Sequence, residues 1–142
     1  MIIKLNNYTM DIIKYINILF SIKPVNKLNN GQAGEEKACK YLKKDGYKII
    51  EKNFACKYGE IDIIARDKDV LCFIEVKSRK GTDYGLPEEF VDKRKQQKLI
   101  KTSLVYTISK INNETDKRFD IVSVDLSSGE CRNIKNAFEV DL

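Results

Sequence analysis

Hydrophobic residues recur at helical spacing over positions 32–45, which predicts a helix. Gly46 would end this helix, because glycine readily adopts the left-handed conformation of helix ends. Three segments rich in Ile, Val, Phe and Tyr follow, and each predicts a β-strand: residues 47–53, 60–66 and 71–78. The polar residues 67–69 predict a tight turn between the second and third of these strands.

The second half of the chain repeats the alternation of helix and strand. Residues 79–85 form a polar, glycine-containing loop, and Pro87 suits the first turn of a long helix that reaches about residue 110. Residues 119–126 predict a fourth strand, and residues 131–138 a possible fifth. This order of elements predicts an α/β fold, in which helices flank a mixed central β-sheet.

Residues 1–30 differ in amino-acid composition from the rest of the chain. Their hydrophobic residues follow an amphipathic helical pattern at positions 12, 13, 16, 19 and 20, among several Asn and Lys residues. No stretch approaches the roughly 18 continuous apolar residues of a membrane span. We therefore expect a partly helical N-terminal extension over residues 1–30, docked on a domain of residues 31–142 or lying on a membrane surface, with no integral membrane association.

Charged residues interrupt the two most hydrophobic strands. Strict alternation in the segment 60–66 would place Asp62 on one face with Glu60 and Ile64, and would place Ile61, Ile63 and Ala65 on the other. In the next strand, Glu75 and Lys77 share a face. If the turn between the strands contains two or four residues, Asp62 lies opposite Glu75 and Ile64 lies opposite Phe73.

Glu35 is a further carboxylate on a hydrophobic surface. A helical projection places it between Leu42 and Cys39, in the middle of the apolar arc of the first predicted helix. A buried carboxylate requires a compensating cation or metal. A position in the first helical turn offers an alternative explanation, because the positive end of the helix dipole favours a negative charge.

These charges have a structural and a catalytic interpretation. In the structural one, Lys77 forms an ion pair with Glu60, Glu75 or Asp62 on a half-solvated sheet face. In the catalytic one, Asp62 and Glu75 converge and repel each other unless a proton or metal lies between them. Carboxylate oxygens suit Mg²⁺ or Mn²⁺, and a nearby lysine could position water and stabilise charge on a phosphate. These groups fit phosphodiester hydrolysis.

Composition narrows the possible chemistry. The 142 residues include no histidine, which excludes catalytic triads and zinc sites that depend on imidazole. The four cysteines form no C-x-x-C pair, so we expect reduced, mostly buried thiols in a cytoplasmic protein. The net charge of +5 permits a polyanionic partner.

The ordered motifs resemble those of a known family. The strings are GQAGE at 31–35, GEIDIIA at 59–65, FIEVKSR at 73–79, KQ at 95–96, RFD at 118–120 and NAF at 136–138. Together they resemble the YraN-like family of uncharacterised bacterial predicted endonucleases. Within them, Asp62 followed by Glu75-Val76-Lys77 is similar to the Asp…Glu-x-Lys signature of the restriction-endonuclease-like superfamily.

The resemblance implies a restriction-endonuclease-like core, similar to that of Holliday-junction resolvases. It also implies a Mg²⁺- or Mn²⁺-dependent endonuclease acting on nucleic acid, with branched DNA as a candidate substrate. Asp62, Glu75 and Glu35 would be the metal ligands, and Lys77 would be the catalytic lysine. By analogy with resolvases, a homodimer is expected. The alternatives are a catalytically inactive nucleic-acid-binding or assembly module on the same fold, and an interaction protein that binds no nucleic acid.

Several further residues are candidates for contacts with nucleic acid. Arg79 follows directly on the strand that carries Glu75, so it could meet a backbone phosphate. Lys95 and Gln96 belong to the long predicted helix, where Lys95 is expected to point toward the sheet. Tyr58 and Tyr84 fall in predicted loops and could stack on unpaired bases, although loop tyrosines more often pack locally.

Overall fold

The computed structural model describes residues 30–81, 91–110 and 115–140. Within these ranges the chain forms two helices, α2 (Asn30–Lys44) and α3 (Lys93–Lys110). The strands of the described residues are β1 (Lys48–Cys56), β2 (Gly59–Asp67), β3 (Val70–Arg79), β4 (Lys117–Asp125) and β5 (Cys131–Phe138). The predicted α/β class is confirmed, and so is the fifth strand.

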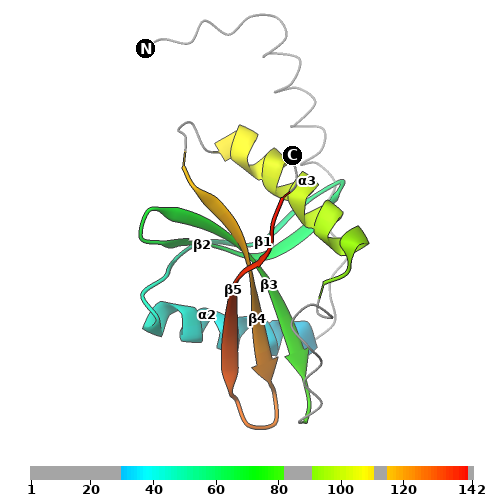
Figure 1. The fold of residues 1–142 in the computed structure, drawn as a ribbon. Helices are drawn as coiled ribbons and strands as arrows, with labels where there is room; N and C mark the ends of the chain where they lie inside the picture. The colour runs from blue at the N-terminus through cyan, green and yellow to red at the C-terminus, as the bar shows by residue number, and fades with distance from the viewer. Residues whose placement is uncertain (1–29, 82–90, 111–114, 141–142) are drawn as a thin grey trace, which may run out of the picture.

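The strands form one mixed sheet in the order β1-β2-β3-β4-β5. Neighbouring strands are antiparallel except β3 and β4, which are parallel and are separated along the chain by α3. The sheet twists strongly, so that the β1–β2 hairpin runs across the direction of β3, β4 and β5 (Figure 1). This architecture is consistent with the expected restriction-endonuclease-like core.

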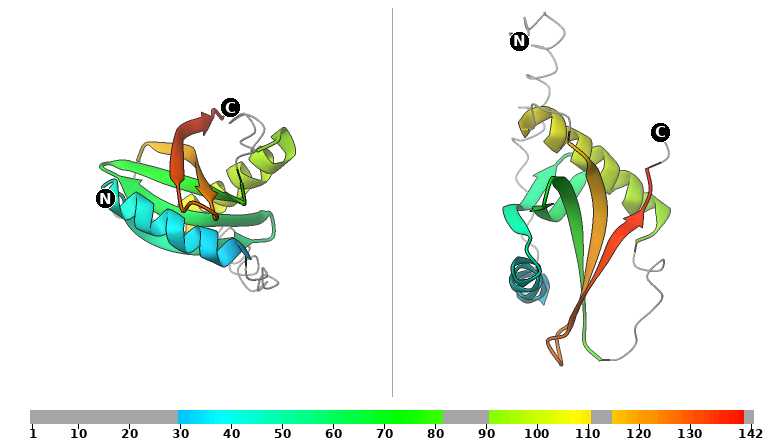
Figure 2. Two further views of the ribbon diagram at one scale, coloured as in Figure 1. Left: turned by 90° about the horizontal axis from the view of Figure 1, so that it is seen from below. Right: turned by 60° about the vertical axis from the view of Figure 1, so that its left-hand side comes forward.

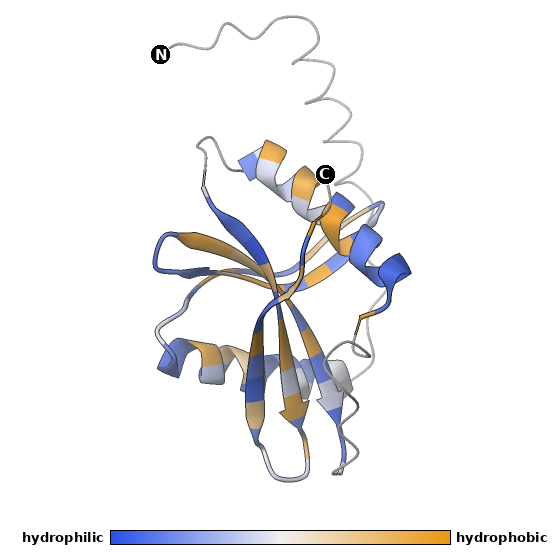
Figure 3. Ribbon diagram, in the orientation of Figure 1, coloured by the Kyte–Doolittle hydropathy of each residue, from blue (hydrophilic) through white to orange (hydrophobic). Residues whose placement is uncertain are grey.

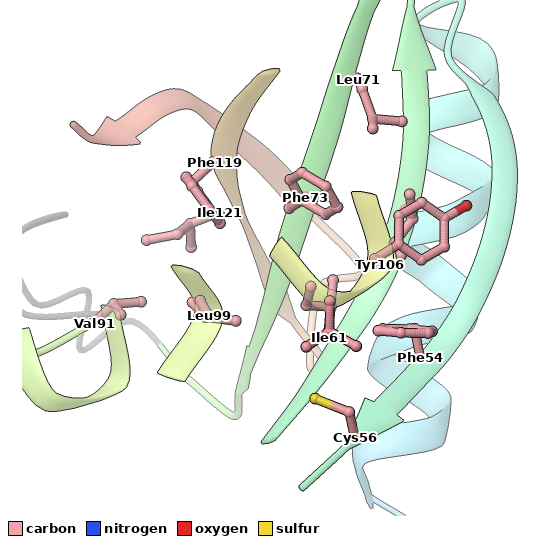
Figure 4. Packing of buried hydrophobic residues seen from close by; sticks show 12 residues of the cluster. Phe54, Cys56, Ile61, Leu71, Phe73, Val91, Leu99, Tyr106, Phe119 and Ile121 are labelled. Carbon is pink, nitrogen blue, oxygen red and sulfur yellow. The ribbon is translucent and has the colours of Figure 1, made fainter. Parts of the chain in front are cut away.

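The two helices cover opposite faces of the sheet (Figure 2). On the α3 face, a cluster that includes Phe73, Leu99 and Tyr106 is buried (Figure 4). The rings of Tyr106 and Phe73 pack edge to face, with their centroids 5.9 Å apart. On the α2 face, Leu42 and Ile74 belong to a second cluster. The first six residues of α3 are all charged or amide-bearing, so this end of the helix is strongly hydrophilic (Figure 3).

Helix α2 packs closely against β3 at Gly34. A Cβ atom added at Gly34 would lie 1.7 Å from Ser78 Oγ and 2.9 Å from Ser78 Cβ. No side chain larger than hydrogen fits there without a shift of the helix or the strand. Gly34 therefore lets the first turns of α2, which carry Glu35, lie directly on the sheet.

The turn between β2 and β3 has the predicted length. Asp67 pairs with Val70, which leaves Lys68 and Asp69 as a two-residue turn. The resulting register pairs Ile64 with Phe73, as expected.

Strict alternation along β2 was a wrong prediction. Ile61 and Ile64 both belong to the cluster on the α3 face, whereas Ile63 belongs to the cluster on the α2 face. The change of side falls at Asp62, across from Asn53 of β1, whose φ of 54° is in the left-handed region. A local backbone irregularity of this kind re-aims the side chains that follow it.

Helix α3 also begins later than Pro87. Its first residue is Lys93, because Asp92 acts as the N-cap: Asp92 Oδ1 accepts a hydrogen bond of 2.8 Å from the Lys95 backbone N–H. Pro87 itself lies outside the described residues.

The remaining sequence expectations concern thiols and membrane association. Cys39, Cys56 and Cys72 are free and buried, and Cys131 is free and partly buried, as expected. Burial raises the pKa of the Cys72 thiol to about 11. Within the described ranges, no helix is long and apolar enough to cross a membrane. The predicted extension of residues 1–30 lies almost wholly outside the described residues.

A network of charged and polar side chains holds together the end of β2, the start of β4 and the end of β5. Arg118 donates hydrogen bonds to the buried Asp120 carboxylate at 2.9 and 3.1 Å and to Asp67 at 2.7 Å. Asp120 also accepts a hydrogen bond from the Asn136 backbone N–H, and Arg118 donates one to the Tyr47 hydroxyl. This network ties β2, β4 and β5 together, which gives the motif residues Arg118, Asp120 and Asn136 a structural role.

Candidate active site

Three carboxylates gather where α2 meets the start of β2. Oxygen atoms of Glu35, Glu60 and Asp62 all lie within 4.8 Å of one another. Glu35 comes from the second turn of α2, whereas Glu60 and Asp62 come from the first half of β2. The change of side at Asp62, across from Asn53 of β1, and the close approach at Gly34 bring these three side chains together.

The Asp62 carboxylate is fixed against the neighbouring strand. Pairing between β2 and β3 ends at Ile63 and Ile74, one residue before Asp62 would pair with Glu75. Beyond that point, Asp62 Oδ2 accepts a hydrogen bond of 2.9 Å from the Val76 backbone N–H. Asp62 is only 2% exposed. A buried side chain thus replaces the backbone pairing and holds its carboxylate beside β3.

Glu75 is a buried carboxylate with two different oxygen environments. Its Oε1 lies 3.1 Å from Lys95 Nζ and 3.7 Å from Lys77 Nζ. Its Oε2 is buried and has no hydrogen-bond partner among the described residues. Burial raises the pKa of Glu75, and the nearby charge of Asp62 raises it further, while Lys95 and Lys77 act in the opposite direction.

An open pocket of about 420 Å³ adjoins these groups. Glu35 and Asp62 line it from α2 and β2, and Lys77 lines it from β3. Arg79 and Lys80 extend the lining at the end of β3. The pocket therefore joins carboxylates and basic residues around one space that is open to solvent.

The donor set fits a hard divalent cation. Three carboxylates this close together repel one another unless a cation or shared proton lies among them. The pKa of the Glu75 carboxyl group is raised, and its buried Oε2, which has no hydrogen-bond partner among the described residues, is a further oxygen that a proton or cation could satisfy. Oxygen-only ligands suit Mg²⁺ or Mn²⁺. Asp62 with Glu35 and Glu60 would hold the ion, and Glu75 lies on the strand beside them.

The structure separates the predicted ligands into two sets. Glu35 and Asp62 belong to the carboxylate group, whereas Glu75 lies beside Lys77 and Lys95. Sequence reasoning did not include Glu60 among the ligands and considered it only as an ion-pair partner of Lys77. Its position two residues before Asp62 on the same predicted strand was the signal that could have identified it.

The residues predicted to contact nucleic acid lie in different parts of the structure, and only some of them are at the pocket. Lys95 points toward the sheet, as expected, where it pairs with Glu75. The Gln96 side chain donates a hydrogen bond of 3.0 Å to the Val91 carbonyl, so it also fixes the start of α3. Arg79 lines the pocket, and Tyr58 lies in the turn between β1 and β2. Tyr84 lies outside the described residues.

Comparisons with known proteins agree on one family. A family model described as "Uncharacterised protein family UPF0102" matches residues 34–124. A UPF0102 protein of Caldanaerobacter subterraneus is 47% identical over 122 residues, which cover 82% of this chain and all of the relative. A UPF0102 protein of Syntrophus aciditrophicus is 47% identical over 115 residues, which cover 80% of this chain and 91% of the relative. A UPF0102 protein of Clostridium botulinum is 49% identical over 115 residues, which cover 78% of this chain and 94% of the relative.

Proposed function

The chain belongs to the uncharacterised protein family UPF0102, the YraN family, and we propose that it is a divalent-metal-dependent endonuclease that hydrolyses phosphodiester bonds of nucleic acid. The observation that carries the proposal is the gathering of Glu35, Glu60 and Asp62 oxygens within 4.8 Å, beside a pocket that Lys77 also lines. Carboxylates and a lysine at one open pocket are the groups that metal-assisted phosphodiester hydrolysis requires.

Each residue has a distinct proposed role. A bound Mg²⁺ or Mn²⁺ would supply Lewis-acid stabilisation of the phosphate and activation of a water molecule. Asp62, Glu35 and Glu60 would provide oxygen ligands, and Glu75 would complete the acidic site from β3. Lys77 would donate hydrogen bonds to a phosphate oxygen and place positive charge where negative charge develops.

Lys95 supports this arrangement through Glu75. Its ammonium group, 3.1 Å from Glu75 Oε1, lowers the pKa that burial raises and so favours the ionised form of this carboxylate. Lys95 thereby acts as a positioning residue in the proposed mechanism. The expected direct contact of Lys95 with nucleic acid is replaced in this proposal by Arg79 and Lys80, which line the open side of the pocket.

DNA is the substrate that we propose, with branched DNA as the first structure to test. The net charge of +5 and the basic residues at the pocket favour a polyanionic backbone. The branched form follows from the family resemblance, which implies a core similar to that of Holliday-junction resolvases. The same similarity supports a homodimer as the active species.

The test is a cleavage assay with matched variants of the full chain. Four-way junctions, flaps, single strands and duplexes are incubated with the protein in Mg²⁺ or Mn²⁺. Asp62→Asn and Glu35→Gln should reduce cleavage by about 100-fold or more. Glu36→Gln is the control, because Glu36 is exposed and follows Glu35 on α2. Cleavage that survives Asp62→Asn, or no cleavage of any substrate by the wild-type protein, would refute the proposal.

The ion pairs of Glu75 favour a second candidate function. Two lysines near one buried carboxylate also describe a structural cluster in a catalytically inactive nucleic-acid-binding module. Such a module would bind nucleic acid in a salt-dependent manner, without cleavage and without dependence on divalent metal. The same set of substrates distinguishes the two functions when binding in EDTA is measured beside cleavage.

A further inference from the structure

The turn between β1 and β2 presents an aromatic side chain to solvent. Cys56 pairs with Gly59, which leaves Lys57 and Tyr58 as the two residues at the tip of the hairpin. Tyr58 is 37% exposed and is one of the few large hydrophobic side chains on the described surface. An exposed aromatic ring on a hairpin tip offers a flat surface on which another flat group can stack.

Two lysines lie near this ring. Lys57 Nζ lies 4.9 Å from the centroid of the Tyr58 ring, and Lys101 Nζ of α3 lies 5.9 Å from it. Cation–π contacts of this kind hold the ring and the ammonium groups together. The result is an aromatic surface combined with positive charge from two different elements. This combination matches a nucleotide, whose base is flat and aromatic and whose phosphate is negative.

The hairpin tip also has a firm support. A Cβ atom added at Gly59 would lie 3.5 Å from Thr102 Oγ1 and 3.6 Å from Lys98 Cβ, so the backbone rests against α3. The φ of Gly59 is +152°, a conformation that other residues rarely adopt. Because the tip is packed on a helix, little ordering of the hairpin is required when a ligand stacks on Tyr58.

The ring lies close to the candidate active site along the chain. Tyr58 precedes Glu60 by two residues and Asp62 by four, at the end of the hairpin where β2 begins. With a rise of about 3.3 Å per residue, the Cα atoms of Tyr58 and Asp62 are at most about 13 Å apart. Tyr58 therefore lies beside α3 at the end of β2 that carries Glu60 and Asp62, and Glu35 reaches that end of the strand from α2 on the opposite face of the sheet.

We propose that Tyr58, with Lys57 and Lys101, forms a stacking site for an unpaired base of a nucleic acid strand. The inference rests on the proposed function, since it assigns the substrate class of the same site: a strand with an unpaired base near the phosphate that is cleaved. In a continuous duplex each base is already stacked between its neighbours, so its face is not available to the Tyr58 ring. The site thus distinguishes flaps and single strands, which have unpaired bases, from intact duplex.

The test measures binding in EDTA, so that cleavage does not enter. A fluorescently labelled oligothymidylate and a labelled blunt duplex hairpin are titrated with the full chain and followed by fluorescence anisotropy. Tyr58→Ala should weaken binding of the single strand by at least about fivefold, since base stacking on an aromatic residue contributes on that scale. Tyr58→Phe should stay within about twofold of wild type, and affinity for the duplex should be unchanged in both variants.

Ile50→Ala is the matched control, because Ile50 is an exposed hydrophobic residue elsewhere on β1. It should bind both probes as the wild type does. Circular dichroism melting curves of all variants check that each one folds. Lys101→Ala should weaken binding of the single strand and reduce its dependence on salt, because one cation near the strand is lost.

Three outcomes would overturn the inference: Tyr58→Ala binds the single strand as tightly as wild type, Tyr58→Phe loses as much affinity as Tyr58→Ala, or the wild-type protein binds no single strand. Its failure is distinct from failure of the proposed function. Cleavage without any role for Tyr58 in binding refutes only the stacking site. Binding that depends on Tyr58 without cleavage refutes only the nuclease.

Discussion

Substitution of Gly34 by alanine tests whether close packing of α2 on β3 positions the acidic site. In an unconstrained helix interior, Gly→Ala stabilises a protein by about 1 kcal/mol. At Gly34, however, the new Cβ would lie 2.9 Å from Ser78 Cβ and 1.7 Å from Ser78 Oγ. Rotation of the serine side chain can move Oγ, but only a shift of the backbone relieves the contact between the two Cβ atoms.

The sign of the stability change on Gly34→Ala shows whether overpacking against Ser78 or the better helix propensity of alanine is the larger contribution. Overpacking costs about 1–3 kcal/mol, so Gly34→Ala should destabilise the protein or at best leave its stability unchanged, despite the better helix propensity. In a Ser78→Gly background both clashing atoms are absent, and Gly34→Ala should then stabilise by up to about 1 kcal/mol. The free energy of unfolding of the four proteins of this double-mutant cycle is measured by urea denaturation.

The same substitution has a consequence for the site. A backbone shift at Gly34 moves the adjacent Glu35 away from Asp62, so Gly34→Ala should weaken Mn²⁺ binding, and Ser78→Gly should restore it. Clear stabilisation by Gly34→Ala in the wild-type background would refute the packing argument. Stabilities that simply add in the cycle would refute it as well, because they would show no coupling between Gly34 and Ser78.

Three further predictions concern other parts of the fold. Asp92→Ala removes the N-cap of α3 and should cost about 1 kcal/mol in urea denaturation, whereas Asp92→Asn should retain most of the stability. Asp120→Ala leaves the mostly buried Arg118 without its main partner and should cost about 3 kcal/mol or more, with little dependence on salt. Burial raises the pKa of Glu75 above its ordinary value of 4.5, so the folded protein binds this proton more tightly than the unfolded chain does. As pH rises from 4.5 to the pKa of the folded state, the unfolded chain loses the proton first, and Glu75 therefore lowers the free energy of unfolding over that interval. Glu75→Gln should therefore flatten the loss of stability as pH rises above 4.5, and an unchanged slope would contradict the assignment.

The fold was largely accessible from the sequence, because local patterns determine most of it. Runs of β-branched and aromatic residues identified the strands, and the short polar segment around Lys68 and Asp69 set the register of Ile64 opposite Phe73. The start of α3 was predicted at Pro87, although the true signal is also local, because Asp92 is a good N-cap residue.

The site could be predicted only in part, because its geometry depends on tertiary contacts. Simple alternation could not reveal that β2 changes side at Asp62, since the irregularity across from it arises at Asn53 of the partner strand. The grouping of Glu60 with Glu35 requires the close approach of α2 to the sheet at Gly34. The ion pair of Lys95 with Glu75 likewise depends on where α3 crosses β3.

The most direct test of the central claim is a crystal of the full chain soaked in Mn²⁺, with anomalous diffraction used to locate the ion. The account predicts one or more ions at Asp62, with an Asp62 oxygen and at least one oxygen of Glu35, Glu60 or Glu75 at about 2.0–2.6 Å from the metal. Crystals of Asp62→Asn, soaked in the same way, should show markedly lower occupancy. Absence of an ion at Asp62 in a saturated wild-type crystal would contradict the assignment of this carboxylate group as a metal site.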